Sequence, residues 1–416
     1  MGLVDSLWRK LTQTKALEES SGKLETLFFE SVYRVTYLAG LSSSDTHPVY
    51  RAYSIVVKLS IILFVSSELW YLVSETSSMD NIIDNINVTL IHLIAIYRYK
   101  KLMDHKDMYK ELAKSMESPH FDISTPKRKK LVQFWVIRNE RYLKLLLGLG
   151  TCTLAAWYVY PLVDDLEYNL SVAVRLPIEY RTPSRYPLAY IVVLITFNYI
   201  SYFVMVNDLI MQAHLMHLLC QFAVLADCFE NIINDCNVET QGISQNKLFL
   251  SEKFKEKYLC RLNDLVDQHK FILHHTMTLG KILSTPMLGQ LAASSMLICF
   301  AGYQVATTVT ISLTKFLMSL LYLGYSMFEL FIFCRWCDEI KIQSENIRLA
   351  VYCSGWERGI AAVPGIKTRL MLIVARANKP MILTAGGLYD LSLNSYTTVV
   401  KTSYSALTVL LRLRQE

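Results

Sequence analysis

Long apolar runs separated by charged links dominate the pattern of this chain. A helix that crosses a bilayer needs about 20 mostly apolar residues, and several runs approach or exceed this length. The runs cover residues 53–73, 82–97, 143–163, 188–211, 282–314, 316–334 and 381–411. We therefore predict an all-α, polytopic membrane protein with seven transmembrane helices.

Helical periodicity continues past several of these runs into polar sequence. It extends the fourth run to about residue 235 and the sixth through Ala350, and residues 246–281 form an amphipathic helix that enters the fifth run. Its apolar residues share one stripe that a single short hairpin cannot bury; they include Leu259, Leu262 and Leu265. We predict a cytosolic layer in which subunits associate. The alternative is that these helices pack only within one subunit.

These patterns divide the chain into six parts. They are a cytosolic N-terminal segment (1–50), spans one to four with the extension of the fourth (51–236), a cytosolic amphipathic helix (237–281), spans five and six (282–340), a cytosolic link with a short helix (341–379) and the seventh span (380–416).

The first 25 residues lack the apolar core of a secretory signal, so we expect no cleavage there.

The distribution of Lys and Arg orients the spans. Residues 74–87 contain none, whereas residues 98–141 contain twelve. The N-terminus and the even-numbered links are therefore predicted to be cytosolic, and the C-terminus extracellular. This orientation is opposite to that of a G-protein-coupled receptor. The basic run at 127–130 is a positive flank of the membrane, so we expect no nucleic-acid binding.

Composition supports a membrane protein without a catalytic or metal centre. Hydrophobic residues make up 52% and charged residues 19% of the 416 residues, against about 45–50% and 25% in soluble domains. Most of the nine cysteines lie beside segments predicted to be cytosolic, where thiols stay reduced. Cys334 and Cys337 form a lone C-x-x-C without the further ligands of a zinc site. We expect no metal, no cofactor and no enzymatic activity.

The last apolar run carries polar groups that a helix surrounded by lipid has no use for. Asp390, Asn394 and Lys401 interrupt it, together with several hydroxyls. At about 100° per residue, one face collects an apolar series with polar interruptions; it consists of Tyr404, Leu407, Thr408 and Leu411. Such a face suits a helix that lines a narrow pathway. The alternative is a helix packed inside the bundle, with its hydroxyls bonded to neighbouring backbone.

Two segments resemble the insect odorant receptor family. They are VVKTSYSALTVLLRL at 399–413 and MFELFIFCRWCDEIKIQSENIRLAVYCSGW at 327–356. The chain is more similar to the ligand-tuning receptors than to their shared co-receptor, because the link between spans four and five is short. The resemblance implies a ligand-gated, non-selective cation channel, assembled as a tetramer with the co-receptor in the plasma membrane of a sensory neuron. It also implies a pore lined by the seventh spans, with apolar gate residues at Leu407 and Leu411.

The resemblance further places an odorant pocket among spans two, three, four and six, in the outer half of the membrane. The residues at that depth are Val88, His92, Gly150, Thr153, Trp157, Phe197, Ser201, Tyr322 and Tyr325. We expect a small volatile ligand there; the alternative for each residue is ordinary packing of the bundle. The sequon at Asn169 falls on an outer loop and predicts glycosylation.

Three alternatives to an odorant-gated heteromer stay open on the sequence. A gustatory-receptor-like channel would share the topology and form homomers without the co-receptor. A metabotropic seven-helix receptor would form no pore of its own. A transporter would show internal inverted repeats, and no such repeat is visible.

Overall fold

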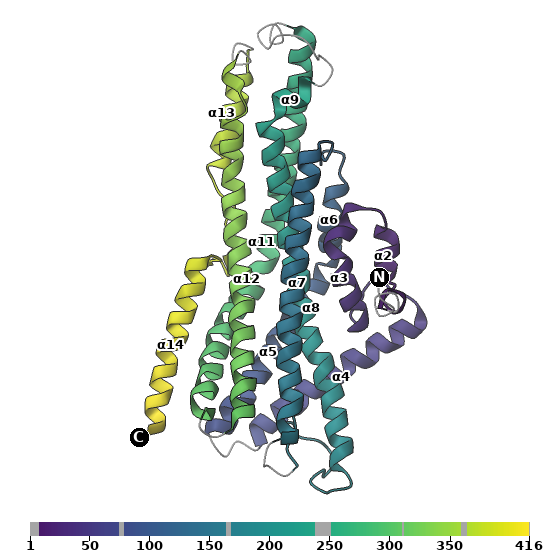
Figure 1. Cartoon of the computed structure of the whole chain (residues 1–416), viewed down its shortest axis with the longest axis vertical. Helices are drawn as coiled ribbons and strands as arrows, with labels where there is room; N and C mark the ends of the chain where they lie inside the picture. Colours follow the sequence, from purple (N-terminus) through teal and green to yellow (C-terminus); the bar gives the residue numbers. More distant parts are fainter. Residues whose placement is uncertain are drawn as a thin grey trace.

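The computed structural model describes residues 8–74, 79–163, 168–237, 251–309, 312–358 and 364–415. It is a long bundle of helices that run roughly along one axis (Figure 1). Within these residues the longest helices are α4 (Pro48–Ser74), α5 (Met79–Asp104), α7 (Pro126–Val163), α8 (Tyr186–Glu230), α11 (Glu252–Thr308), α12 (Leu313–Tyr352) and α14 (Leu393–Gln415). One of these helices coincides with or overlaps each predicted span, so the all-α prediction is confirmed.

The helices differ in how plainly they qualify as membrane spans. By length and hydropathy alone, α4, α7, α8, α11 and α12 qualify within the described residues. Polar side chains interrupt the other two: Asn85 and Asn87 are buried in α5, and α14 carries the exposed Lys401. Both helices nevertheless pack along α11. Because polar groups within a membrane need partners or water, α5 and α14 are the helices in which function is most expected.

Four helices extend far beyond the thickness of a bilayer. α7, α8, α11 and α12 contain 38, 45, 57 and 40 residues, whereas a span needs about 20. The ends of the last three form the top of the molecule in Figure 1 together with α9 (Ile232–Asn237) and α13 (Ile366–Ala377). Leu262 and Leu265 are fully buried within this single chain, so packing inside the subunit accounts for the predicted apolar stripe. Subunit association through this layer stays a prediction, and residues 246–250 lie outside the described part.

The predicted start of the seventh span, directly after Pro380, is wrong. The helix α14 begins only at Leu393. Before it lie two short antiparallel strands, β1 (Thr384–Ala385) and β2 (Tyr389–Asp390). Gly386 and Gly387 have φ of 61° and 70°, values that glycine adopts without strain. The apolar run therefore turns back on itself, and Asp390 lies before the helix and not inside a span.

The turn is anchored on α11. The Gly386 amide donates a hydrogen bond to the Ser284 carbonyl at 2.8 Å. The Leu383 side chain fits over Gly280, where an added Cβ would lie 2.7 Å from Leu383 Cδ2. This docking fixes where α14 starts, and the helix then runs beside the lower bundle in Figure 1.

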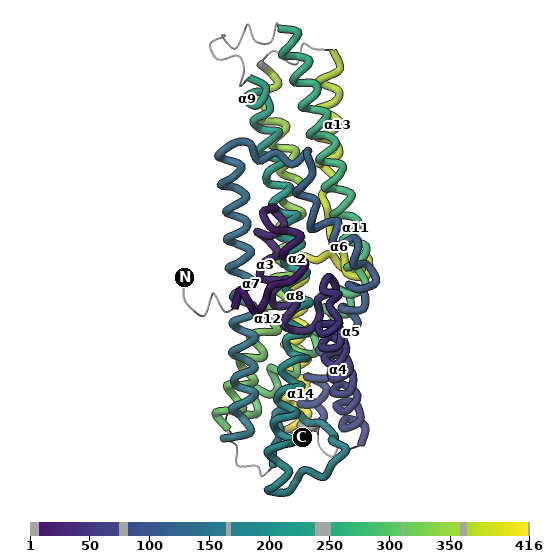
Figure 2. The backbone as a smooth tube through the Cα atoms, turned by 90° about the vertical axis from the view of Figure 1, so that its right-hand side faces the viewer, coloured from purple at the N-terminus to yellow at the C-terminus, as the bar shows by residue number. Residues whose placement is uncertain are grey.

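The N-terminal helices pack on the side of the bundle. They are α2 (Lys15–Ser20) and α3 (Leu24–Leu38), next to α6 (Lys106–Lys114) and a short 3-10 turn at Ser115–Glu117. Phe28, Phe29 and Val32 of α3 are buried, and α3 contacts α7 and α8. Figure 2 shows this group at mid-height of the molecule. It therefore lies where the cytosolic ends of the spans are predicted, at the inner surface of the membrane.

Candidate functional site

A cavity of about 60 Å³ lies between α5, α7, α8 and α12. This volume is several times the roughly 10–15 Å³ that one water requires. Its lining consists of Val88, Ile91, His92, Gly150, Thr153, Leu154, Trp157, Phe197, Ser201, Val204, Met205, Tyr322 and Tyr325. All nine residues placed by the sequence at this depth line the same cavity. Their role in binding a ligand stays a prediction.

Four residues that line the cavity were not predicted from the sequence. They are Ile91, Leu154, Val204 and Met205. Helical spacing could have found two of them, because Val204 and Met205 follow Ser201 by three and four positions and so share its face. Ile91 and Leu154 each adjoin a predicted residue in sequence. Their apolar side chains carry no signal that separates a cavity wall from ordinary packing.

Aromatic rings form much of the wall. The Trp157 ring lies 5.3 Å from the Phe197 ring and 6.1 Å from the Tyr322 ring between centroids. The His92 ring lies 6.3 Å from Phe197. Edge-to-face and tilted arrangements of this kind are favourable beyond the area that they bury. The packed rings thus give the cavity a wall of aromatic surface against which a small apolar or aromatic molecule can pack.

Gly150 sets the free space in the cavity. A Cβ at this position would lie 2.5 Å from Met205 Sδ and 3.3 Å from Tyr325 Cε2. Any side chain here would push the Met205 thioether out of its place. The absence of a side chain on α7 therefore allows α8 and α12 to approach without closing the cavity.

Few polar groups of the wall are available to a ligand. The Thr153 hydroxyl donates to the Leu149 carbonyl at 2.8 Å, and the Tyr322 hydroxyl donates to the Asn87 carbonyl at 3.2 Å. Ser201 is half-buried and forms no hydrogen bond to other described residues. A ligand with one hydrogen-bonding group would therefore meet Ser201 as an unoccupied partner.

A buried histidine–carboxylate pair borders the cavity. His92 Nδ1 lies 2.9 Å from Glu68 Oε2, and both side chains are almost completely buried. Glu68 comes from α4, so the pair ties α4 to α5. The other carboxyl oxygen, Glu68 Oε1, is buried without a hydrogen-bond partner among the described residues. The wall is thus apolar on most sides and polar behind His92.

An ionic cluster lies next to the cavity and joins four helices. Arg98 Nη2 lies 2.6 Å from Asp208 Oδ1, and Arg98 Nη1 lies 3.2 Å from Glu329 Oε1. Arg98 also donates to Gln290 Oε1 at 3.1 Å. The Tyr325 hydroxyl, which faces the cavity, donates to Asp208 Oδ2 at 3.2 Å. A single side chain therefore touches both the cavity and a network that reaches α11 through Gln290.

The predicted pore face of α14 divides into two environments. Tyr404 is 66% exposed, whereas Leu407 is half-buried against α11, where a Cβ on Gly302 would lie 3.0 Å from Leu407 Cδ2. Thr408 and Leu411 are also half-buried. The Ser403 hydroxyl lies within hydrogen-bonding distance of the Ser295 carbonyl, at 2.9 Å, which matches the alternative of bonding to neighbouring backbone.

Part of α14 nevertheless stays open in this chain. Beside Tyr404, the large hydrophobic residues Val409 and Leu413 are 56% and 59% exposed. The Thr408 hydroxyl donates to the Ser405 carbonyl of its own helix at 2.7 Å. The α14 side chains Tyr404, Val409 and Leu413 are therefore mostly exposed in this chain, although α14 also contacts α12.

The sequon at Asn169 lies in a folded part of the outer loop. Asn169 is half-buried, and the Tyr186 hydroxyl donates to its carbonyl at 2.6 Å. The sequon serine, Ser171, is 4% exposed. Glycosylation of Asn169 stays a prediction.

Comparisons with known proteins agree with this architecture. A family model described as 7tm Odorant receptor matches residues 51–404. Odorant receptor 2a of Drosophila melanogaster is 26% identical over 179 residues, which are 42% of this chain and 43% of that protein. Odorant receptor 13a of the same species is 20% identical over an alignment that covers 98% of this chain and 94% of that protein.

A solved structure shares the fold over nearly the whole chain. It is the insect olfactory receptor OR5 from Machilis hrabei in complex with eugenol, with a TM-score of 0.77 at 16% identity, covering 94% of this chain and 99% of that chain. The family model matches most of the sequence, and the seven-helix fold matches end to end. The chain therefore belongs to the 7tm odorant receptor family and is a multi-pass membrane receptor, not an enzyme.

Proposed function

We propose that this chain is the odorant-sensing subunit of a heteromeric, ligand-gated, non-selective cation channel. In this proposal a small volatile molecule binds in the cavity between α5, α7, α8 and α12. Its binding favours a state in which α14 moves outward and opens a central pore. The partner is the family's co-receptor, in the plasma membrane of a sensory neuron.

The cavity is the observation that carries the proposal. Its aromatic and apolar wall with one unoccupied hydroxyl, Ser201, is typical of sites for small organic ligands. A ligand that buries about 250 Å² of apolar surface gains about 6 kcal/mol, part of which offsets its lost translational and rotational freedom. Selectivity must then come from the fit to the wall. The related receptor solved with eugenol, a small aromatic molecule, supports this class of ligand.

In this proposal, the contacts next to the cavity connect ligand binding to the pore. Tyr325 reaches Asp208, and Arg98 carries the network to Gln290 on α11. The same helix contacts α14 through Ser295 and Gly302. A ligand shifts an equilibrium only through different affinities for the two states. Contacts that hold Tyr325 differently in the two states would provide that difference.

Current recordings test the assembly directly. Cells that express this chain with the co-receptor should respond to members of a panel of volatiles, and cells that express either chain alone should not. Responses of equal size without the co-receptor would favour a homomeric, gustatory-receptor-like channel. Responses that need a G protein, with no current of their own, would favour a metabotropic receptor.

Replacing Tyr325 with phenylalanine should change the ligand response about tenfold or more. The ring and the cavity are kept, but the hydrogen bond to the Asp208 carboxylate is lost, and bonds to charged groups contribute about 1.5–3 kcal/mol. Dose–response curves measure the change. Tyr322→Phe is the matched control, because it removes a weaker bond to the Asn87 carbonyl in the same cavity. Equal shifts in the two variants would contradict the proposed coupling.

Replacing Leu407 with serine should raise the current without ligand. Apolar rings close pores by excluding water, and the lost contact with Gly302 also loosens α14 from α11. Truncating a buried leucine costs about 2–5 kcal/mol; for a half-buried one we expect about 1 kcal/mol, or about a fivefold rise in open probability. Leu320→Ser is the control, because Leu320 is exposed on α12. A basal current equal to that of the control would argue against the gate.

A further inference from the structure

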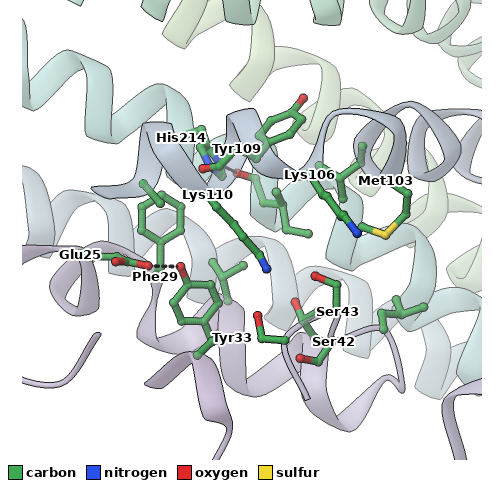
Figure 3. Close-up of a pocket in the computed structure, with 18 of the residues that line it drawn as sticks. Glu25, Phe29, Tyr33, Ser42, Ser43, Met103, Lys106, Tyr109, Lys110 and His214 are labelled. Carbon is green, nitrogen blue, oxygen red and sulfur yellow. Dashed lines mark hydrogen bonds between the residues drawn. The ribbon is translucent and has the colours of Figure 1, made fainter. Parts of the chain in front are cut away.

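A second cavity, of about 120 Å³, lies between the N-terminal helix α3, the segment that follows it, the α5–α6 corner and α8. Figure 3 shows its interior. It lies where α5 ends at Asp104 and shortly before α4 begins at Pro48. Both points are predicted to be at the cytosolic surface of the membrane. This cavity shares no lining residue with the one between α5, α7, α8 and α12.

Cationic and hydroxyl groups gather on one side of this cavity. Lys106, Lys110 and Lys114 line it at four-residue spacing along α6, next to Ser43 and Ser44. All three lysines are exposed, and none forms an ion pair or hydrogen bond with another described residue. In Figure 3 the Lys110 ammonium extends into the middle of the cavity. This side can bind a phosphate through charge-assisted hydrogen bonds.

An acidic group lies at the other end. Glu25 is 5% exposed and accepts a hydrogen bond from the Tyr33 hydroxyl at 2.5 Å through Oε1. Its second oxygen, Oε2, is buried and has no hydrogen-bond partner among the described residues. Phe29 and Tyr33 present their rings beside it (Figure 3). A carboxylate next to aromatic faces is the surrounding that an ammonium group prefers.

Two more polar atoms of the lining lack a partner. They are Thr36 Oγ1 and Tyr99 Oη, both buried and unbonded within the described residues. A buried polar atom without a hydrogen bond costs about 1–3 kcal/mol. Together with Glu25 Oε2, they make three such atoms around one cavity. We infer from them that a polar molecule completes the site.

Glu19, Ser42, Tyr109 and His214 also line the cavity, but much of its remaining surface is apolar. The apolar side chains include Val32, Leu41, Leu102, Met103 and Ile210. A soluble metabolite with a phosphate and an ammonium would leave these side chains without a partner. A lipid would cover them with the first part of its acyl chains, because the cavity lies beside the predicted cytosolic ends of α4 and α5.

We propose that this cavity binds the headgroup of an aminophospholipid from the inner leaflet. The phosphate lies against Lys106 and Lys110, and the ammonium donates to Glu25 Oε2. The bound lipid joins α3 to α5, α6 and α8, and so holds the N-terminal helices on the bundle. Neither half of the site is sufficient by itself: the lysines select phosphate, and Glu25 selects a headgroup with N–H donors.

Native mass spectrometry of the full-length receptor, purified with its co-receptor in detergent, tests the proposal. Dioctanoyl phosphatidylethanolamine and phosphatidylserine should be retained more strongly than phosphatidylcholine, which has no N–H donor, or phosphatidic acid, which has no ammonium. Soluble phosphoethanolamine distinguishes a lipid from a free headgroup and should bind weakly. Preference for phosphatidic acid would overturn the ammonium half of the site, and equal retention of phosphoethanolamine would overturn the assignment to a lipid.

Variants separate the two halves of the site. Lys106→Ala with Lys110→Ala should lower retention of phosphatidylethanolamine about tenfold, as expected for lost charge-assisted hydrogen bonds. Lys129→Ala with Lys130→Ala removes the same charge from exposed positions outside the cavity and should have no effect. Lys106→Arg with Lys110→Arg should keep binding.

Glu25→Gln preserves the size of the side chain and should abolish the preference for phosphatidylethanolamine over phosphatidylcholine while keeping phosphate binding. Equal loss in the two lysine pairs would overturn the site. An unchanged headgroup preference in Glu25→Gln would do the same.

Discussion

Gly150→Val is expected to weaken the odorant response about 100-fold or abolish it. One extra methylene in a binding pocket changes recognition by about 1–3 kcal/mol, and valine adds three carbons. The first of them would already lie 2.5 Å from Met205 Sδ. Met205 must then move into the 60 Å³ cavity, and the ligand loses its space. Dose–response currents in cells with the co-receptor measure the loss.

Gly148→Val is the matched control for this experiment. It lies two positions earlier in α7, and a Cβ there meets no atom within 4 Å. We expect its response to equal that of the unchanged receptor. Surface labelling of both variants separates a closed cavity from a failure to assemble. A Gly150→Val receptor that reaches the surface and responds normally would show that the ligand binds elsewhere.

Arg98→Met is expected to destabilise the receptor by about 3–5 kcal/mol, the usual cost of removing one partner of a buried ion pair. Asp208 is 0% exposed and Glu329 2%, so both carboxylates would lose their cation in a place that water does not reach. A loss of this size is a large part of the roughly 5–15 kcal/mol that keeps a protein folded. Thermal unfolding of the purified complex and the fraction of receptor at the cell surface measure it.

Two further variants test whether the stranded carboxylates cause that loss of stability. Arg335→Met removes a cation from a partly exposed pair with Glu339 on the same bundle, and such pairs contribute about 0–1 kcal/mol. Arg98→Met combined with Asp208→Asn and Glu329→Gln should recover stability, because neutral groups replace the stranded charges. If Arg98→Met were no less stable than Arg335→Met, the cluster would not support the fold as described.

The two largest effects test different parts of one proposal. Gly150→Val acts on the space for the ligand and should leave folding intact. Arg98→Met acts on the network beside the cavity and should reduce the amount of folded receptor. Tyr325 contacts both, so its phenylalanine variant should keep the receptor at the surface and change only the response. Each outcome thus points to one element of the structure.

The lining of the cavity between α5, α7, α8 and α12 could be anticipated because it depends on local properties of helices. His92, Thr153 and Trp157 lie at a depth that the apolar runs define, and side chains three or four positions apart share a helix face. The resemblance to the family then indicated which helix faces meet. The polar partners behind the pocket could not be anticipated in this way. Glu68 and Asp208 are remote in sequence from the residues they bind, and no periodicity pairs them.

Sequence by itself determined the helices, their order and their orientation, because these follow from the length of apolar runs and the distribution of Lys and Arg. Tertiary structure alone decided the start of α14, where Gly386 and Gly387 turn an apolar segment back onto α11. It also decided that Leu407 faces Gly302 and that α3 closes a cavity over α6. Hydropathy records only whether a residue avoids water; which partner it meets depends on how separate helices pack.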